Sequence, residues 1–213
     1  MAGRNFPHLP GILSTADLHR TADSIEALQL TNGMIPWYPD GHCDPWNHVE
    51  TAIALDIMGR HDSALAAYHW LANIQHNDGS WFNYYMPTGD IEDAKLDTNV
   101  TAYIAAGVWA HWLCTRDTKA VIELWPTVRA ALDFVMGMRR EDGMVLWARE
   151  VDAKPWDYAL LTGSSSIAHA LRCGRRSGSG RRVSTRASMI CATGRGGSAP
   201  SSCGARWAWS SSS

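Results

Sequence analysis

The sequence lacks several features that each define a class of protein. Its five cysteines form no CxxC pair and two of them lie in the last forty residues, which argues against a disulfide framework and a zinc signature. No run approaches the roughly 18 apolar residues of a membrane span, and residues 1–13 lack the long apolar stretch of a signal peptide. We therefore expect a soluble, cytoplasmic protein with no membrane partner.

Acidic residues are missing from the C-terminal part of the chain. Residues 1–173 contain all 21 acidic and 12 of the 19 basic side chains, a net charge of −9, whereas residues 174–213 contain seven arginines and no acid, a net charge of +7. Eleven serines and seven glycines make up more than half of the other residues in this tail. Such a composition cannot bury enough apolar surface to offset the entropy lost on ordering, so we expect the tail to be disordered.

Two explanations of this tail are open. A basic nucleic-acid-binding segment is one, but the tail has no lysine and ends in Trp-Ala-Trp and four serines, and we expect no nucleic-acid partner. A shifted reading frame in GC-rich DNA, beginning near codon 173, explains better why Arg, Gly, Ser and Ala occur without acids. The chain then divides into an N-terminal extension (1–14), a folded region (15–173) and a truncated, out-of-frame tail (174–213).

Three turns in the folded region share one plan. Each has Asn or Asp, then glycine, then a tryptophan within four residues of the glycine, at residues 32–37 (Asn-Gly-Met-Ile-Pro-Trp), 78–81 (Asp-Gly-Ser-Trp) and 142–147 (Asp-Gly-Met-Val-Leu-Trp). Their glycines are 46 and 64 residues apart. A period of this length indicates stacked supersecondary units, none of which can bury its apolar face alone.

The segments between the turns have helical periodicity. Val49, Ile53 and Ile57 are spaced four residues apart, and the same spacing recurs from Val100 onward. An interior proline costs about 3 kcal/mol, so we expect Pro126 to begin the longer part of its helix. No convincing alternating strand is present, which makes the predicted class all-α, with helices near 15–31, 46–58, 62–76, 98–114, 117–139 and 162–172.

Two motifs resemble those of known helical toroids. The pattern from Trp70 to Trp81, with Leu71, Gln75 and Gly79 between them, resembles the QW repeat of the terpene cyclases. The second motif is Leu-Trp-Ala-Arg-Glu at residues 146–150, and it is followed later by Gly163 and three serines. It resembles the acid-bearing segment of the glucoamylase-type glycosidases, the six-hairpin (α/α)6 toroids.

The second likeness has one departure from the family pattern. In glucoamylase-type enzymes the acid follows the tryptophan directly, whereas here Ala148 and Arg149 separate Trp147 from Glu150. The chain also resembles an actinobacterial group of toroids that are often filed as prenyltransferases. Together these likenesses imply an incomplete (α/α)6 toroid of about three helix hairpins, followed by the disordered C-terminal tail.

The resemblance places the loops before the inner helices around a substrate pocket. These loops combine carboxylate, amide and aromatic groups, a mixture that suits the hydroxyls and CH faces of sugars. The substrate-binding candidates are Trp37, Asp40, His42, Asp44, Trp46, Asp97, Asn99, Trp147 and Trp156.

Structural roles are the alternative for several of these residues. Asp44 and Asp97 occupy ordinary N-cap positions, which stabilise a helix by about 1 kcal/mol. Packing explains the tryptophans in the turns as well as ligand binding does. A solvated loop acid explains Glu150 as well as a catalytic acid does. The histidines show no repeated ligand spacing, so we expect no metal site and no other cofactor.

The glycosidase likeness implies inverting hydrolysis of an α-linked oligo- or polysaccharide. This chemistry needs two carboxyl groups about 6.5–9.5 Å apart. By the resemblance Glu150 is the expected acid with Asp157 in reserve, and Asp44 and Asp97 hold sugar hydroxyls. The base of that family comes from the last hairpin, so we expect this chain to be inactive, with carbohydrate as its partner and no obligate protein partner.

An isoprenoid cyclase or prenyltransferase is the alternative function, and the QW-like repeat supports it. Against it, the sequence has no Asp-x-Asp-Asp motif and no Asp/Cys/His zinc set, and packing of Gln75 and Trp81 also explains the repeat. A helical-repeat binding surface without catalysis is a third possibility.

Three hairpins would leave an apolar interface exposed, which predicts low solubility and proteolysis after about residue 172.

Overall fold

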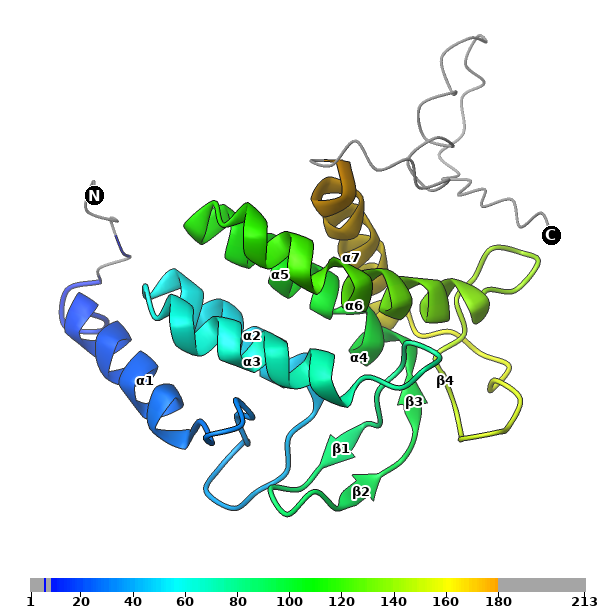
Figure 1. Ribbon diagram of the computed structural model, residues 1–213, viewed down its shortest axis with the longest axis horizontal. Coiled ribbons are helices and arrows are strands. Elements are labelled where there is room, and N and C mark those ends of the chain that lie inside the picture. The colour runs from blue at the N-terminus through cyan, green and yellow to red at the C-terminus, as the bar shows by residue number, and fades with distance from the viewer. Residues whose placement is uncertain (1–5, 7–8, 180–213) are drawn as a thin grey trace, which may run out of the picture.

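The computed structural model describes residue 6 and residues 9–179, so the predictions for residues 180–213 lie outside the described part. The described chain is mainly helical, as expected (Figure 1). Its elements are α1 (Thr15–Leu28), α2 (Pro45–Ile57), α3 (His61–Ile74), β1 (Tyr84–Tyr85), β2 (Ile91–Asp93), β3 (Leu96–Asp97), α4 (Thr98–Ala102), α5 (Ile104–Thr115), α6 (Thr118–Gly137), β4 (Ala148–Arg149) and α7 (Leu161–Ser179). No helix among these residues is long and apolar enough to cross a membrane.

The helices form two layers. The outer layer holds α1, α3 and α6, and the inner layer holds α2, the pair α4 and α5, and α7 (Figure 1). α2 packs on α1, α3 and α5, while α5 packs on α2, α3, α6 and α7. Each outer helix and the inner helix after it make one hairpin, and apolar side chains from both layers fill the space between them.

The inner helices begin at one end of the layers, which we call the rim. Asp44 caps α2 and accepts one backbone N–H of the first turn, and Asp97 caps α4 and accepts two. These bonds satisfy donors that have no partner inside a helix. Both aspartates therefore have the N-cap role that their positions predicted.

Four short strands, which periodicity did not reveal, lie at the rim. β1 pairs antiparallel with β2, and β3 pairs antiparallel with β4. An isolated bridge between Cys43 and Tyr85 attaches β1 to the residues before α2. Each strand has only two or three residues, too few for an alternating pattern to be recognised in the sequence.

The three predicted turns have the same backbone geometry. Gly33, Gly79 and Gly143 have φ of +96°, +91° and +94°, a region that side chains disfavour. In each turn the carboxylate or amide oxygen of the preceding Asn or Asp accepts the N–H of the residue after the glycine, at 3.0 Å in all three. The repeat read from the sequence is therefore a repeat of structure.

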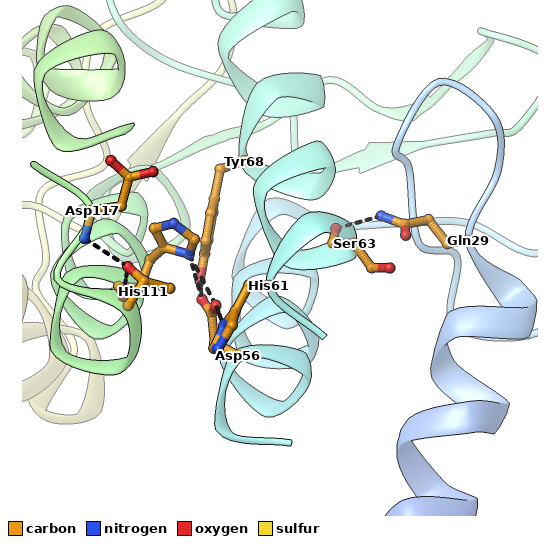
Figure 2. Close-up of polar contacts among 8 residues, drawn as sticks. Gln29, Asp56, His61, Ser63, Tyr68, His111 and Asp117 are labelled. Atoms are coloured by element: carbon orange, nitrogen blue, oxygen red, sulfur yellow. Dashed lines mark hydrogen bonds and ion pairs between the residues drawn. The ribbon is translucent and has the colours of Figure 1, made fainter. Parts of the chain in front are cut away.

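Glutamine side chains join successive hairpins. Gln29 Nε2 donates to the carbonyl of Gly33 at 3.0 Å. It also donates to the carbonyl of Ser63 in α3 at 2.9 Å (Figure 2). Gln75 Nε2 donates in the same way to Gly79 and to Thr127 in α6, both at 3.0 Å. These bonds connect adjacent outer helices at the level of the turns.

Trp81 completes the QW-like motif as a packing element. It is fully buried, and its indole N–H donates to the carbonyl of Leu71 at 2.9 Å. Because Gln75 is hydrogen-bonded across the hairpins, both Gln75 and Trp81 have structural partners. Packing therefore accounts for the motif without an isoprenoid ligand.

A buried carboxylate holds the opposite end of α2. Asp56 is fully buried and receives contacts from His61 and His111, both at 2.9 Å, and from the hydroxyl of Tyr68 at 3.4 Å (Figure 2). Burial, and then the charge of Asp56, raise the pKa of Tyr68 well above its usual value, so the hydroxyl keeps its proton and donates. The group ties α2, α3 and α5 together.

Two helix boundaries differ from the prediction. Pro126 lies inside α6 rather than at the start of a helix. It is on the exposed face, where water can reach the carbonyl that loses its N–H partner, while the neighbouring Leu124 and Val128 are buried and hold the helix in place. The predicted helix 98–114 is also divided, because α4 ends at Ala102 and α5 starts at Ile104.

The last helix extends beyond its predicted end. α7 runs to Ser179, seven residues beyond the predicted helix end at residue 172. A Cβ on Gly174 would lie 2.4 Å from Leu132 Cδ1, and one on Gly178 would lie 2.8 Å from the indole of Trp125. These glycines allow α7 to pack closely, although the composition from residue 174 onward predicts disorder.

Candidate active site

Asp97 is held between two hairpins at the rim. β3 places it opposite Ala148 of β4, and the N–H of Thr98 donates to the carbonyl of Trp147 at 2.9 Å. Asp97 Oδ1 accepts the N–H groups of Asn99 and Val100 at 2.8 and 3.1 Å, and Oδ2 accepts the indole N–H of Trp147. Burial raises the pKa of this carboxyl above its ordinary value, although these bonds and the charge of Lys95 act in the opposite direction.

Asp44 has a matching arrangement at the start of α2. Its Oδ1 accepts the N–H of Asn47 at 2.9 Å, and its Oδ2 accepts the side-chain amide of Asn47 and the indole N–H of Trp37, both at 2.8 Å. Asp44 and Asp97 are 4% and 6% exposed. Two neighbouring inner helices thus start with a buried aspartate that also receives a tryptophan indole.

Aromatic and polar side chains surround Asp44. His42 stacks on Tyr84 with the ring centroids 4.5 Å apart, and its Nδ1 lies 2.5 Å from a carboxylate oxygen of Glu92. Trp37 packs edge-on against His42 at 4.8 Å and is 48% exposed. His42 Nε2 is buried and has no hydrogen-bond partner within the described residues.

Tyr84 links the surroundings of the two aspartates. Partial burial raises its pKa, and the negative charges of Asp44, Asp93, Glu92 and Asp97 raise it further. The charges of both Asp44 and Asp97 therefore act on the Tyr84 hydroxyl.

A second aromatic cluster lies beside Asp97. The rings of Trp147 and Trp156 are 5.2 Å apart, Trp156 and Tyr158 are nearly parallel at 6.3 Å, and Lys95 Nζ lies 5.0 Å over the ring of Trp147. Aromatic faces of this kind stack on the CH faces of sugars. Trp156 is half-buried and Tyr158 is exposed, so both residues remain accessible to solvent.

Trp46 and Asn99 occupy the second position of α2 and of α4. Trp46 packs on Tyr103 with 5.0 Å between the centroids, and the Tyr103 hydroxyl donates to Glu50. Both Trp46 Nε1 and Asn99 Oδ1 are buried and lack a hydrogen-bond partner among the residues described. A buried donor and a buried acceptor that are unpaired at the rim are expected where a ligand supplies the missing partners.

Sequence reasoning missed Tyr84, Glu92, Glu50 and Tyr103. Glu50 follows Trp46 by four residues and Tyr103 follows Asn99 by four, so helical spacing places each on the same face as a predicted residue. That signal was available for both. For Tyr84 and Glu92 no signal was available, because they reach the rim through the short strands β1 and β2.

The comparisons with known proteins agree with this architecture. No protein-family model matches the chain. It is 42% identical over 167 residues to an MMP endo-(1,4)-3-O-methyl-alpha-D-mannosidase of Mycolicibacterium hassiacum. The match covers 78% of this chain and 46% of the relative. It is also 27% identical over 84 residues to an uncharacterized glycosyl hydrolase of Methanocaldococcus jannaschii, which covers 39% of this chain and 14% of that protein.

Two solved structures share the fold at low sequence identity. An unsaturated glucuronyl hydrolase specific for heparin has a TM-score of 0.57 at 17% identity, covering 76% of this chain and 50% of that chain. A D-mannose isomerase has a TM-score of 0.58 at 11% identity, covering 81% and 49%. The fold is that of the six-hairpin, glycosidase-like α-toroids. The chain spans about half the length of the M. hassiacum relative and of the two solved structures.

In this half-toroid the predicted site residues fall into two groups. One cluster holds Trp37, His42 and Asp44, and the other holds or adjoins Asp97, Asn99, Trp147 and Trp156. Trp46 is the second residue of α2 and packs on Tyr103. The remaining three, Asp40, Glu150 and Asp157, are exposed. Asp157 is 88% exposed and accepts a hydrogen bond from Arg140 Nη1 at 3.0 Å.

Proposed function

We propose that this half-toroid carries the sugar-binding rim of a glycoside hydrolase that cleaves an α-linked mannose polysaccharide. The observation that carries the proposal is Asp97, a buried carboxylate that is held by the indole of Trp147 beside a cluster of aromatic rings. The name of the M. hassiacum relative supports the choice of substrate class. That name specifies 1,4-linked 3-O-methyl-α-D-mannose units.

Asp44 and Asp97 bind sugar hydroxyls in this proposal. An ionised carboxylate has about four sites for hydrogen-bond donors. Each aspartate uses three of them for donors within the protein. The remaining site accepts a substrate hydroxyl, and the protein donors hold the oxygen in position before the sugar arrives.

The aromatic rings fit a methylated sugar. A 3-O-methyl group replaces a hydroxyl donor by an apolar group, which gains by contact with rings such as those of Trp147, Trp156 and Trp37. The unpaired Trp46 Nε1 and Asn99 Oδ1 supply one donor and one acceptor for hydroxyls that are not methylated. The rim thus offers both apolar and polar contacts.

Hydrolysis itself requires carboxyl groups from both halves of a toroid. Glu150, at the end of β4 and close in sequence to Trp147, remains the proposed acid, with Asp157 in reserve. Inversion requires a second carboxyl group about 6.5–9.5 Å away to activate water, and we assign it to the hairpins of the other half. We therefore expect residues 9–179 to bind sugar without turnover.

Sugar binding by the purified chain tests this proposal. Titration with a 1,4-linked oligosaccharide of 3-O-methyl-α-D-mannose should change the tryptophan fluorescence and saturate, and Asp97→Asn should weaken binding. Asp117→Asn is the matched control, because Asp117 caps α6 with the same two backbone bonds, 2.8 and 3.1 Å, but lies outside the rim clusters.

Equal weakening by both substitutions would show that only helix capping matters, and the proposal would then fail. An unmethylated oligosaccharide of the same length serves as the competing ligand. It should bind less tightly if the aromatic rings contact the methyl groups. Tighter binding of the unmethylated sugar would contradict the role given to those rings.

A further inference from the structure

The three turns are alike, but their surroundings are not. The residue after the glycine is 2% exposed in the first turn (Met34) and fully buried in the second (Ser80). In the third turn the same position holds Met144, which is 43% exposed. Gly143 is exposed too, whereas Gly33 and Gly79 are buried. Among residues 9–179, nothing covers the third turn as the first two turns are covered.

The cover of the first two turns is the outer helix of the next hairpin. A Cβ on Gly33 would lie 2.3 Å from the carbonyl oxygen of Ala66 in α3, and one on Gly79 would lie 2.1 Å from that of Ala130 in α6. The backbone of the incoming helix rests directly on the glycine. Three residues earlier, its Ser63 or Thr127 carbonyl accepts the glutamine side chain.

The third turn has the same two contact positions, a glycine and a polar side chain four residues before it. Arg139 precedes Gly143 by four residues, the position of Gln29 and Gln75 in their turns. Its guanidinium lies over the glycine, with Nη2 3.6 Å from the position of a Cβ, and its Nε is buried without a hydrogen-bond partner within residues 9–179. Nothing else among these residues lies within 4 Å of that position.

We propose that residues 139–144 form a docking surface for the outer helix of a further toroid hairpin, carried by the complementary half of a toroid. The partner helix places a small residue on Gly143, as Ala66 and Ala130 do on their glycines. The carbonyl three residues earlier in that helix accepts a hydrogen bond from Arg139. The exposed side chain of Met144 becomes buried beneath the same helix.

A second copy of the chain fits this surface poorly. Each covering helix contributes two carbonyls at fixed distances before the Gln or Arg that ends its own segment. Ser63 and Ala66 lie 12 and 9 residues before Gln75. Thr127 and Ala130 lie 12 and 9 residues before Arg139. In α1 the same offsets from Gln29 give Asp17 and Arg20. Arg20 would bring a like charge and a long side chain to Arg139, where the turn requires a small residue.

The length of the relatives supports a half-toroid as the occupant. The chain covers 46% of the M. hassiacum relative, 50% of one toroid of known structure and 49% of another. In each of these proteins a further half of the chain is present beyond the matched length. The surface at Gly143 continues the edge that α3 and α6 already use within this chain.

Co-purification of the two halves tests the proposal. The full 213-residue chain is co-expressed with a separate, tagged polypeptide, the part of the M. hassiacum relative that lies outside the match, and the dissociation constant of the pair is measured. Gly143→Val should weaken the complex by at least about tenfold, the effect of losing one central contact. Gly89→Val is the matched control, because Gly89 has nearly the same φ, +93°, and open space for a Cβ.

A second pair of variants keeps the test valid if Gly143→Val fails to fold. Met144→Glu places a charge on the surface, and Leu113→Glu places one at an equally exposed apolar position on α5. Weakening by Met144→Glu alone supports the proposal. Failure to form a complex, equal effects of each pair, or self-association of the chain that Gly143→Val abolishes would overturn it.

Discussion

The indole N–H of Trp147 donates a hydrogen bond to Oδ2 of Asp97, and this bond joins the third hairpin to the first turn of α4. The two residues are 50 positions apart in the sequence. β3 and β4 hold them in register, since Asp97 pairs with Ala148, the residue after Trp147. The bond therefore has a structural role as well as its place at the candidate site.

Trp147→Phe should separate these roles. The change keeps an aromatic ring but removes the donor to a buried carboxylate, and hydrogen bonds to charged groups contribute about 1.5–3 kcal/mol. We expect a loss of about 2 kcal/mol in urea denaturation, together with weaker sugar binding. Trp109→Phe is the control, since Trp109 stacks on Trp112 in α5. A stability of Trp147→Phe equal to that of wild type would remove the structural role.

Gln75→Ala should loosen the contact between the second and third hairpins. The substitution removes two hydrogen bonds at 3.0 Å, to Gly79 and Thr127, and leaves their carbonyl oxygens without these donors. A loss of about 1–3 kcal/mol is expected from chemical denaturation. Gln29→Ala should lose a similar amount, whereas Asn73→Ala at an exposed position of α3 should change little.

His48 should make the fold sensitive to acid. It is fully buried, with Nε2 2.9 Å from the carbonyl of Ala67 and Nδ1 accepting the N–H of Ile35, and burial lowers its pKa to about 4. The unfolded chain, with a pKa near 6.5, binds the proton more readily. Stability is therefore fully present above about pH 6.5 and falls by about 3 kcal/mol as the pH drops to about 4.

Comparison with His48→Gln isolates this contribution. The variant cannot take up the proton, so its stability should change less between about pH 6.5 and 4 than that of the wild type. His19→Gln, on the exposed face of α1, should retain the full wild-type dependence. Identical pH profiles for His48→Gln and wild type would show that other groups govern the acid response.

Local signals in the sequence predicted the helices, the turns and the caps. The Asn-Gly and Asp-Gly turns are predictable because positive φ favours glycine, and Asp44 and Asp97 are predictable as caps because they precede apolar helical segments. The pairing of Trp147 with Asp97 was not predictable, since it depends on the register of two-residue strands. The end of α7 was misjudged because glycines that pack against Leu132 and Trp125 have the same composition as a flexible segment.

Glycine-to-alanine substitutions in two helices should have opposite effects. Alanine normally stabilises a helix by roughly 0.5–1 kcal/mol relative to glycine. At Gly137, near the end of α6, nothing lies within 4 Å of a new Cβ, so Gly137→Ala should be neutral or stabilising. At Gly174 the Cβ would lie 2.4 Å from Leu132 Cδ1, and Leu132 must move from its buried place. Overpacking of this kind costs about 1–3 kcal/mol.

The net expectation for Gly174→Ala is therefore a loss of about 1–2 kcal/mol, measured by thermal or urea denaturation of the full chain. Leu132→Ala in the Gly174→Ala background provides the decisive comparison. It removes the clashing atom, so the two substitutions should be less damaging together than the sum of their separate effects. Strict additivity would mean that α7 does not pack on α6 at Gly174. Residues 174–179 would then lie outside the folded unit, as the composition of the sequence had suggested.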